Sequence, residues 1–382
     1  MPNNNHEYCK KEYEKLSKNK TTSSIIDINF PSTVNKIKET QDACFLIGYG
    51  NYPPQIRCFD LNNLTLKFQR TVDCEIKDFQ IISDNWEKLA LLRSDKFIEF
   101  HSKSGYYYQI KIPKHSSSLL FDNRCKILYI PSIDGEVFRF NLELGKFVSS
   151  IKSNSKYINT SSANNIFNNL LSLGNSKGII EIWDSRVVHK PISTIDGLLY
   201  LKKKENNIIT CLNFCKATNY KFYAGFSSGE VVIYDLRNLT PIISKNMGNE
   251  LPIKTIDKNK ENNLILSADQ KIIKIWDEIS GKTLERIKTK KQINDVCLLK
   301  NTGFACISTK SPFVDSIYIP LLGPVPNWCF PLNYKSGGLI GKKENFIRIK
   351  RNINSYKKIS ASLDKLNLNK VNCQTKNICY IR

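Results

Sequence analysis

The segment "IIKIWDE", residues 272–278, decides the fold because its pattern recurs along the chain. It reads as a short apolar strand that ends in an aromatic residue and is followed by an acidic residue and a turn. Six further segments follow a similar pattern: "IRCFDL" at 56, "FIEFHS" at 97, "EVFRFNL" at 136, "IIEIWDSR" at 179, "VVIYDLR" at 231 and "SIYIPL" at 316. The sequence therefore contains seven copies of one unit.

The spacing of these copies identifies the architecture. The aromatic position is taken in turn by Phe59, Phe100, Phe140, Trp183, Tyr234 and Trp276, with Ile319 in that place in the last copy. The successive spacings are 41, 40, 43, 51, 42 and 43 residues. A period of about 40–45 residues, built from short strands and carrying Trp-Asp pairs, is typical of WD-type propeller blades. The sequence predicts an all-β, seven-bladed WD40-type β-propeller.

Each unit supplies four strands, as the second one illustrates. Its apolar and polar residues alternate over 76–83, 88–94, 96–102 and 106–113, which suits a twisted antiparallel sheet. The long spacing marks an insertion, "DGLLYLKKKENN" (196–207), predicted as a basic loop between the fourth and fifth blades. The seventh unit runs into prolines before its outermost strand, so "SSIIDINF" (23–30) is predicted to supply that strand and close the ring.

These patterns set the predicted domain boundaries. Residues 1–22 form a polar N-terminal arm, residues 23–332 the propeller, and residues 333–382 a basic C-terminal tail that is partly helical or disordered. The tail carries +10 of the chain's net charge of +22. Clustered positive charge favours polyphosphate partners through counterion release, although biased composition in a solvated tail explains the charge equally well.

Composition excludes several classes of protein. The chain has 382 residues and is 41% hydrophobic, enough to bury a large core, which argues against a disordered protein. Its twelve cysteines are scattered, and Cys211 with Cys215 has no second pair at zinc-ligand spacing, so neither a disulfide framework nor a metal site is expected. No apolar run reaches the roughly 18 residues of a membrane span, and the polar N-terminus resembles no secretory signal.

Two histidines and three tyrosines invite functional interpretations. His101 and His115, each beside a serine, are the candidates for an enzymatic propeller, but His101 occupies the polar position that Asp fills in other blades, where strand-end hydrogen bonding explains it. Tyr106, Tyr107 and Tyr108 could stack on bases. Because neighbouring strand residues point to opposite faces, we expect Tyr106 and Tyr108 to share one face and packing between blades to explain them. No catalytic site, metal site or cofactor is predicted.

Two Asp-x-Arg turns offer a candidate for protein docking. Asp184 with Arg186, and Asp235 with Arg237, resemble the short box by which some WD proteins dock onto a cullin ubiquitin ligase adaptor. A local charge pair tying one turn to its neighbour explains the same residues without docking. A substrate receptor for a cullin ligase is therefore the alternative function.

Several segments resemble the nucleolar protein ten family of WD-repeat proteins. They are "GYGNYPPQIRCFDLNNLTLKFQR" (48–70), "FIEFHSKSGYYYQIKIPK" (97–114), "LPIKTID" (251–257), "LILSADQKIIKIWDEISGK" (264–282), "INDVCLL" (293–299) and "IPLLGPVPNWC" (319–329). Compared with the family, both ends of the chain are shortened. His115–Ser118 stands where family members have a Gly-Arg-Asp element.

The resemblance implies a function. It predicts a non-enzymatic scaffold of the small-subunit processome in the nucleolus, which supports processing of precursor ribosomal RNA and assembly of the small ribosomal subunit. The implied partners are other processome proteins, precursor ribosomal RNA and its guide RNA, with neither a membrane nor a small-molecule substrate. The AT-rich residue bias and the shortened ends suggest a reduced nucleus such as a nucleomorph. The candidates for RNA contact lie in the tail, as cations and stacking aromatics: Lys342, Lys343, Phe346, Arg348, Lys350, Arg351, Tyr356, Lys357 and Lys358.

Overall fold

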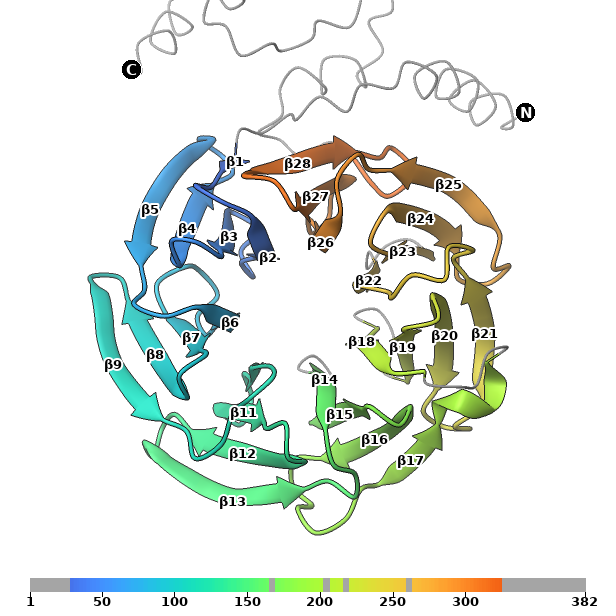
Figure 1. Ribbon diagram of the computed structural model, residues 1–382, viewed down its shortest axis with the longest axis horizontal. Helices are drawn as coiled ribbons and strands as arrows, with labels where there is room; N and C mark the ends of the chain where they lie inside the picture. The colour runs from blue at the N-terminus through green and yellow to red at the C-terminus, as the bar shows by residue number, and fades with distance from the viewer. Residues whose placement is uncertain (1–27, 165–168, 202–206, 216–219, 259–262, 325–382) are drawn as a thin grey trace, which may run out of the picture. The chain divides into compact units, whose positions relative to one another are not determined.

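The computed structural model describes residues 28–164, 169–201, 207–215, 220–258 and 263–324. All of them belong to one compact unit, Ile26–Gly338. They form seven four-stranded antiparallel sheets arranged as the blades of a propeller (Figure 1). The seven-bladed β-propeller predicted from the repeat is confirmed.

Within blades 1 to 6, consecutive strands run from the central channel to the rim (Figure 1). Blade 1 consists of β2 (Val34–Glu39), β3 (Phe45–Gly50), β4 (Gln55–Asp60) and β5 (Thr65–Thr71). Blade 2 consists of β6 (Ile76–Ile81), β7 (Leu89–Arg93), β8 (Phe97–Ser102) and β9 (Gly105–Lys111). Blade 3 consists of β10 (Leu120–Asp122), β11 (Ile127–Pro131), β12 (Glu136–Asn141) and β13 (Lys146–Lys152).

Blades 4 to 6 repeat this order. Blade 4 consists of β14 (Ile158–Asn164), β15 (Leu170–Asn175), β16 (Ile179–Asp184) and β17 (Ser193–Asp196). Blade 5 consists of β18 (Ile209–Phe214), β19 (Lys221–Phe226), β20 (Glu230–Asp235) and β21 (Pro241–Asn246). Blade 6 consists of β22 (Thr255–Lys258), β23 (Leu264–Ala268), β24 (Ile272–Asp277) and β25 (Thr283–Lys288). The insertion after β17 begins with a short 3-10 helix, η1 (Gly197–Tyr200), and joins blade 4 to blade 5 as predicted.

Blade 7 closes the ring with a strand from the other end of the chain. It contains β26 (Ile293–Leu298), β27 (Phe304–Thr309) and β28 (Phe313–Tyr318), and its outermost strand is β1 (Ile28–Asn29). Ile28 pairs with Val314, and Asn29 pairs with Phe313. The prediction that the N-terminal segment completes the last blade is confirmed at these residues; the other predicted strand residues, 23–27, lie outside the described part of the chain.

Strand register corrects one detail of the predicted repeat. Asp277 ends its strand opposite Leu264, and the residue in the corresponding place of blade 7 is Tyr318, opposite Phe304. The aromatic position of the last copy is therefore Ile317, and the prediction of Ile319 was wrong by two residues. Ile317 is partly buried and Ile319 is fully buried, and both are isoleucines, so hydrophobicity alone could not identify the correct position.

The acidic residue after the aromatic fixes the turn that follows it. The Asp60 carboxylate accepts hydrogen bonds from the backbone N–H groups of Asn62 (2.9 Å) and Asn63 (3.2 Å). The Asp277 carboxylate accepts from Ser280 N at 3.1 Å. A side chain that bonds to the backbone two or three residues ahead stabilises a tight turn, which explains why Asp recurs at this place.

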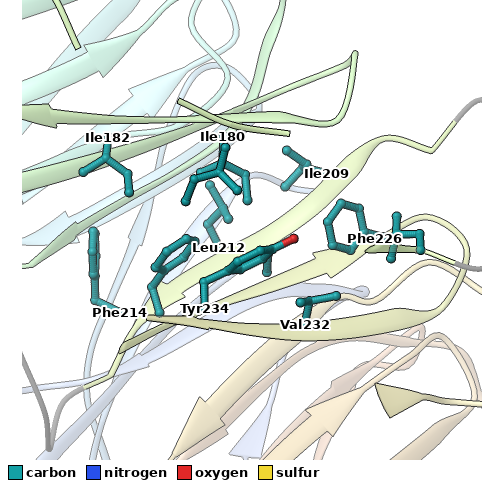
Figure 2. Close-up of a cluster of buried hydrophobic side chains, with 12 residues drawn as sticks. Ile180, Ile182, Ile209, Leu212, Phe214, Phe226, Val232 and Tyr234 are labelled. Atoms are coloured by element: carbon teal, nitrogen blue, oxygen red, sulfur yellow. The ribbon is translucent and has the colours of Figure 1, made fainter. Parts of the chain in front are cut away.

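The core consists of apolar clusters between neighbouring blades. Figure 2 shows the cluster between blades 4 and 5, where Ile180 and Ile182 of β16 face Leu212, Phe214 and Tyr234 of blade 5. Comparable clusters join the other neighbours from blade 1 to blade 7. Each sheet therefore buries both faces, which accounts for strands that are apolar over most of their length. Among the described residues, no helix is long and apolar enough to cross a membrane.

Replacing Trp276 with Ala should strongly destabilise the propeller. The Trp276 side chain is fully buried between blades 5 and 6, and its Nε1–H donates to Ser267 Oγ at 3.0 Å. Removing it should lower the free energy of unfolding by about 3–5 kcal/mol, measured by denaturant unfolding. Leu284→Ala in the same blade, where the side chain is 52% exposed, is the control and should cost no more than about 0.5 kcal/mol. Equal costs for the two variants would contradict the assignment of Trp276 to the core.

Candidate interaction surfaces

The central channel is one of two prominent cavities. It has a volume of about 660 Å³ and is lined by the innermost strands β2, β6, β14, β18, β22 and β26 together with the residues around β10. Its charged lining includes Lys36, Lys38, Asp78 and Asp295. The channel wall is therefore polar, in contrast to the apolar clusters between blades.

Two buried carboxylates in this wall link neighbouring blades. Asp78 of β6 accepts from its own neighbour, Phe79 N (2.8 Å), and from Leu119 N beside β10 (3.0 Å). Asp295 of β26 accepts in the same way from Val296 N (3.0 Å) and from Ile37 N of β2 (3.0 Å). The second pair joins blade 7 to blade 1, so this bond contributes to ring closure.

Two lysines of the channel lie against one of these carboxylates. Lys36 Nζ lies 2.9 Å from Asp78 Oδ1, and Lys38 Nζ lies 3.7 Å from the same atom. Burial alone would raise the pKa of Asp78, but the two lysines and the Leu119 N–H outweigh it and hold the pKa below its ordinary value. Burial lowers the pKa of Lys38 to about 8 and raises the pKa of Asp295 to about 6. Lys36 and Lys38 therefore share the charge of one buried carboxylate in the channel wall.

Replacing Asp78 with Asn should destabilise the protein in a pH-dependent manner. The change leaves Lys36 unpaired in the channel wall; because the Lys36 side chain is 38% exposed, the cost near neutral pH should be about 2–3 kcal/mol rather than that of a fully buried pair. The folded-state pKa of Asp78 lies below its unfolded value, so its contribution is complete above about pH 4 and is lost as the pH falls through the folded-state pKa.

Urea unfolding of wild type and variant near neutral pH and at about pH 3 measures this difference. The gap between the two proteins should narrow in acid. Asp42→Asn, at an exposed turn residue, is the matched control and should show no such gap at either pH. A gap for Asp78→Asn that stays constant over this range would contradict the proposed ion pair.

The three tyrosines lie at the rim of blade 2, not between blades. Tyr106, Tyr107 and Tyr108 are 56%, 76% and 58% exposed. The prediction that they pack between blades was wrong, because β9 is the outermost strand of its sheet. A bulge also interrupts the expected alternation, since Phe100 pairs with Tyr108 whereas His101 pairs with Tyr106. Tyr107 and Tyr108 consequently line the same groove.

This rim groove lies between blades 2 and 3 and has a volume of about 910 Å³. Beneath the two tyrosines, its lining is mainly apolar and includes Phe100, Ile110 and Phe140. Exposed aromatic side chains over an apolar groove are typical of protein interaction sites.

His101 is a buried structural residue. Its ring Nε2 lies 3.1 Å from Glu99 Oε2, and Glu99 also pairs with Arg93. Register places His101 at the Asp position of the repeat, as predicted, but its ring bonds back to β8 instead of to the following turn. His115 lies in the connection between blades 2 and 3, where its carbonyl oxygen accepts from Ile133 N at 3.1 Å. Among the described residues, no group of His, Cys, Asp and Glu side chains could hold a metal ion.

The two Asp-x-Arg turns differ in structure. Arg237 makes two hydrogen bonds to Asp235, at 3.1 and 2.8 Å, and its guanidinium group stacks on Tyr220 at 3.9 Å from the ring centroid. Arg186 is exposed, and its backbone N–H donates to Asp184 at 2.9 Å. The turn at Asp235 and Arg237 therefore forms a local charge pair, which explains these residues without docking.

The predicted RNA-contact residues, Lys342 to Lys358, lie outside the described residues. Sequence reasoning missed a different basic region, the segment "KTLERIKTKKQ" (282–292) around β25, which contains five Lys or Arg residues and one Glu. Its charge run was visible in the sequence. Its neighbours in space, on β21 and β24, could be found only from the sheet pairing.

The fold defines the chain as a WD-type propeller. A family model described as "Nucleolar protein 10-like, N-terminal domain" matches residues 1–334, and the chain belongs to this family. It is 34% identical over 310 residues to nucleolar protein 10 of Rattus norvegicus, covering 80% of this chain and 44% of that protein. It is 36% identical over 314 residues to ribosome biogenesis protein ENP2 of Saccharomyces cerevisiae, covering 80% of this chain and 43% of that protein.

The chain therefore spans less than half the length of these curated relatives. A solved structure with a similar fold is Raptor of Chaetomium thermophilum, with a TM-score of 0.67 over 78% of this chain and 28% of that one. At 13% identity, this likeness concerns the fold alone. Nothing in these comparisons bears on the predicted reduced nucleus.

Proposed function

We propose that this chain is a non-enzymatic scaffold of the nucleolar small-subunit processome, where it supports processing of precursor ribosomal RNA and assembly of the small ribosomal subunit. The observation that carries the proposal is the family match over residues 1–334. Two of the similar proteins, from Saccharomyces cerevisiae and Schizosaccharomyces pombe, are named as ribosome biogenesis proteins. Its partners would be other processome proteins, precursor ribosomal RNA and the associated guide RNA.

The geometry supports a scaffold for two reasons. A closed ring of seven sheets holds its loops on a rigid frame, so distant surface patches keep fixed positions. The rim groove beside Tyr107 and Tyr108 offers an exposed aromatic surface of the kind that binds proteins. At His115–Ser118, where the chain departs from the family, Ser118 Oγ lies 2.6 Å from Ser161 Oγ of blade 4.

Cross-linking followed by sequencing of the bound RNA tests this function. We expect the full chain, expressed in its own cells, to enrich precursor small-subunit ribosomal RNA and the guide RNA that pairs with it. An unrelated propeller of similar charge, handled identically, is the control for non-specific capture. A protein that is cytosolic and recovers no precursor RNA would refute the proposal.

The alternative, a substrate receptor for a cullin ubiquitin ligase, has a separate test. Docking through the Asp-x-Arg turns predicts that Arg186→Ala together with Arg237→Ala abolishes co-purification of the ligase adaptor. Because Arg237 is already paired with Asp235 and stacked on Tyr220, we expect no adaptor to co-purify with either protein. Adaptor bound by wild type and lost in the double variant would favour the alternative over the scaffold.

A further inference from the structure

Like charges face each other on the outer part of blade 6. Lys274 of β24 and Arg286 of β25 are direct cross-strand partners. Two cations in such a pair destabilise a sheet. Lys274 extends toward Gly248 at the end of blade 5, where Lys245 of β21 adds a third cation. Burial and then the charges of Arg286 and Lys245 lower the pKa of Lys274, and the charge of Asp269 offsets only part of this shift.

Neutral oxygens, not carboxylates, accept hydrogen bonds from two of these cations. Lys245 Nζ donates to the Gly281 carbonyl oxygen at 2.6 Å, and Arg286 Nη2 donates to Asn249 Oδ1 at 3.4 Å. The nearby Asp269 is fully buried, and its carboxylate accepts from two backbone N–H groups and the Asn249 amide. In the described ranges, none of the three cations forms an ion pair with a carboxylate.

The positive surface continues over the adjoining loops of blades 6 and 7. Thr289 donates from both its N–H and its hydroxyl to the Lys271 carbonyl oxygen, each at 3.1 Å. Lys310 N donates to the Gln292 carbonyl oxygen at 2.8 Å. These bonds bring together loops that present five exposed lysines: Lys271, Lys288, Lys290, Lys291 and Lys310.

We propose that this basic patch, made of Lys245, Lys274 and Arg286 with the five loop lysines, binds the phosphate backbone of RNA. The inference rests on the proposed function, because RNA is the extended polyanion of a ribosome-assembly particle. Cations spread over three blades match a repeating row of phosphates, and seven of the eight are lysines, which act as point charges. Such contacts position RNA without reading its sequence. The like-charge pair, unfavourable in the free protein, would be relieved on binding.

Fluorescence anisotropy of a labelled RNA hairpin, titrated with the full chain over a range of salt concentrations, tests the patch. The patch variant carries Lys245→Gln, Lys274→Gln and Arg286→Gln. The control variant carries Lys111→Gln, Lys146→Gln and Lys152→Gln, three exposed lysines on β9 and β13, and loses the same charge. We expect the patch variant to bind about tenfold more weakly near physiological salt, with a salt dependence less steep by about one unit per lost phosphate contact. The control should bind like wild type.

Further measurements keep the outcomes distinct. The patch variant should unfold at a denaturant concentration no lower than wild type, because its change removes repulsion; weak RNA binding with intact folding therefore supports the patch. A tail variant, with Lys342, Lys343, Lys357 and Lys358 changed to Gln, reports tail binding separately. Equal RNA binding by the patch variant and wild type overturns the proposal. A labelled polyglutamate peptide that binds through the patch more tightly than the hairpin overturns it as well. Either result would leave recovery of precursor RNA in cells, and thus the proposed function, standing.

Discussion

The closure of the ring is the constraint on which the rest of the structure depends. Six junctions join blades that follow each other in sequence, but the seventh must join the two ends of the propeller. There, β1 pairs with β28, and the Asp295 carboxylate accepts from Ile37 N across 258 residues of sequence. Without this junction, the first and last sheets would expose an apolar face and an unpaired edge. The other surfaces keep their positions because the ring is closed.

Much of the fold could be predicted from one repeated pattern. The strand pattern, the aromatic residue and the acidic residue recur because every blade must bury its sheet faces against its neighbours and end in the same turn. Each copy of the sequence therefore meets the same structural requirements. The last copy was misplaced because Ile317 and Ile319 are both apolar and only strand pairing distinguishes them. The tyrosines were misjudged because a strand's apolar content does not reveal whether a neighbouring blade covers it.

The candidate surfaces were harder to predict than the fold. A tail rich in lysine is visible in sequence, whereas the basic patch takes Lys245 and Arg286 from different blades and becomes a cluster only when the sheets are assembled. His101, by contrast, stands out in the sequence as a candidate functional residue, but in the structure its ring interacts with the Glu99 carboxylate inside blade 2. Placement in space, more than residue type, separates binding residues from structural ones.

Closure by an N-terminal strand also determines the order in which this protein can be completed during synthesis. Ile28 leaves the ribosome before any complete blade, yet its partner Val314 is made only after six blades have been synthesised. Pairings between residues so distant in sequence form slowly and leave apolar surface exposed meanwhile. The nascent propeller therefore passes through a period as an open, incomplete ring, in which chaperones or early binding partners could protect its terminal blades.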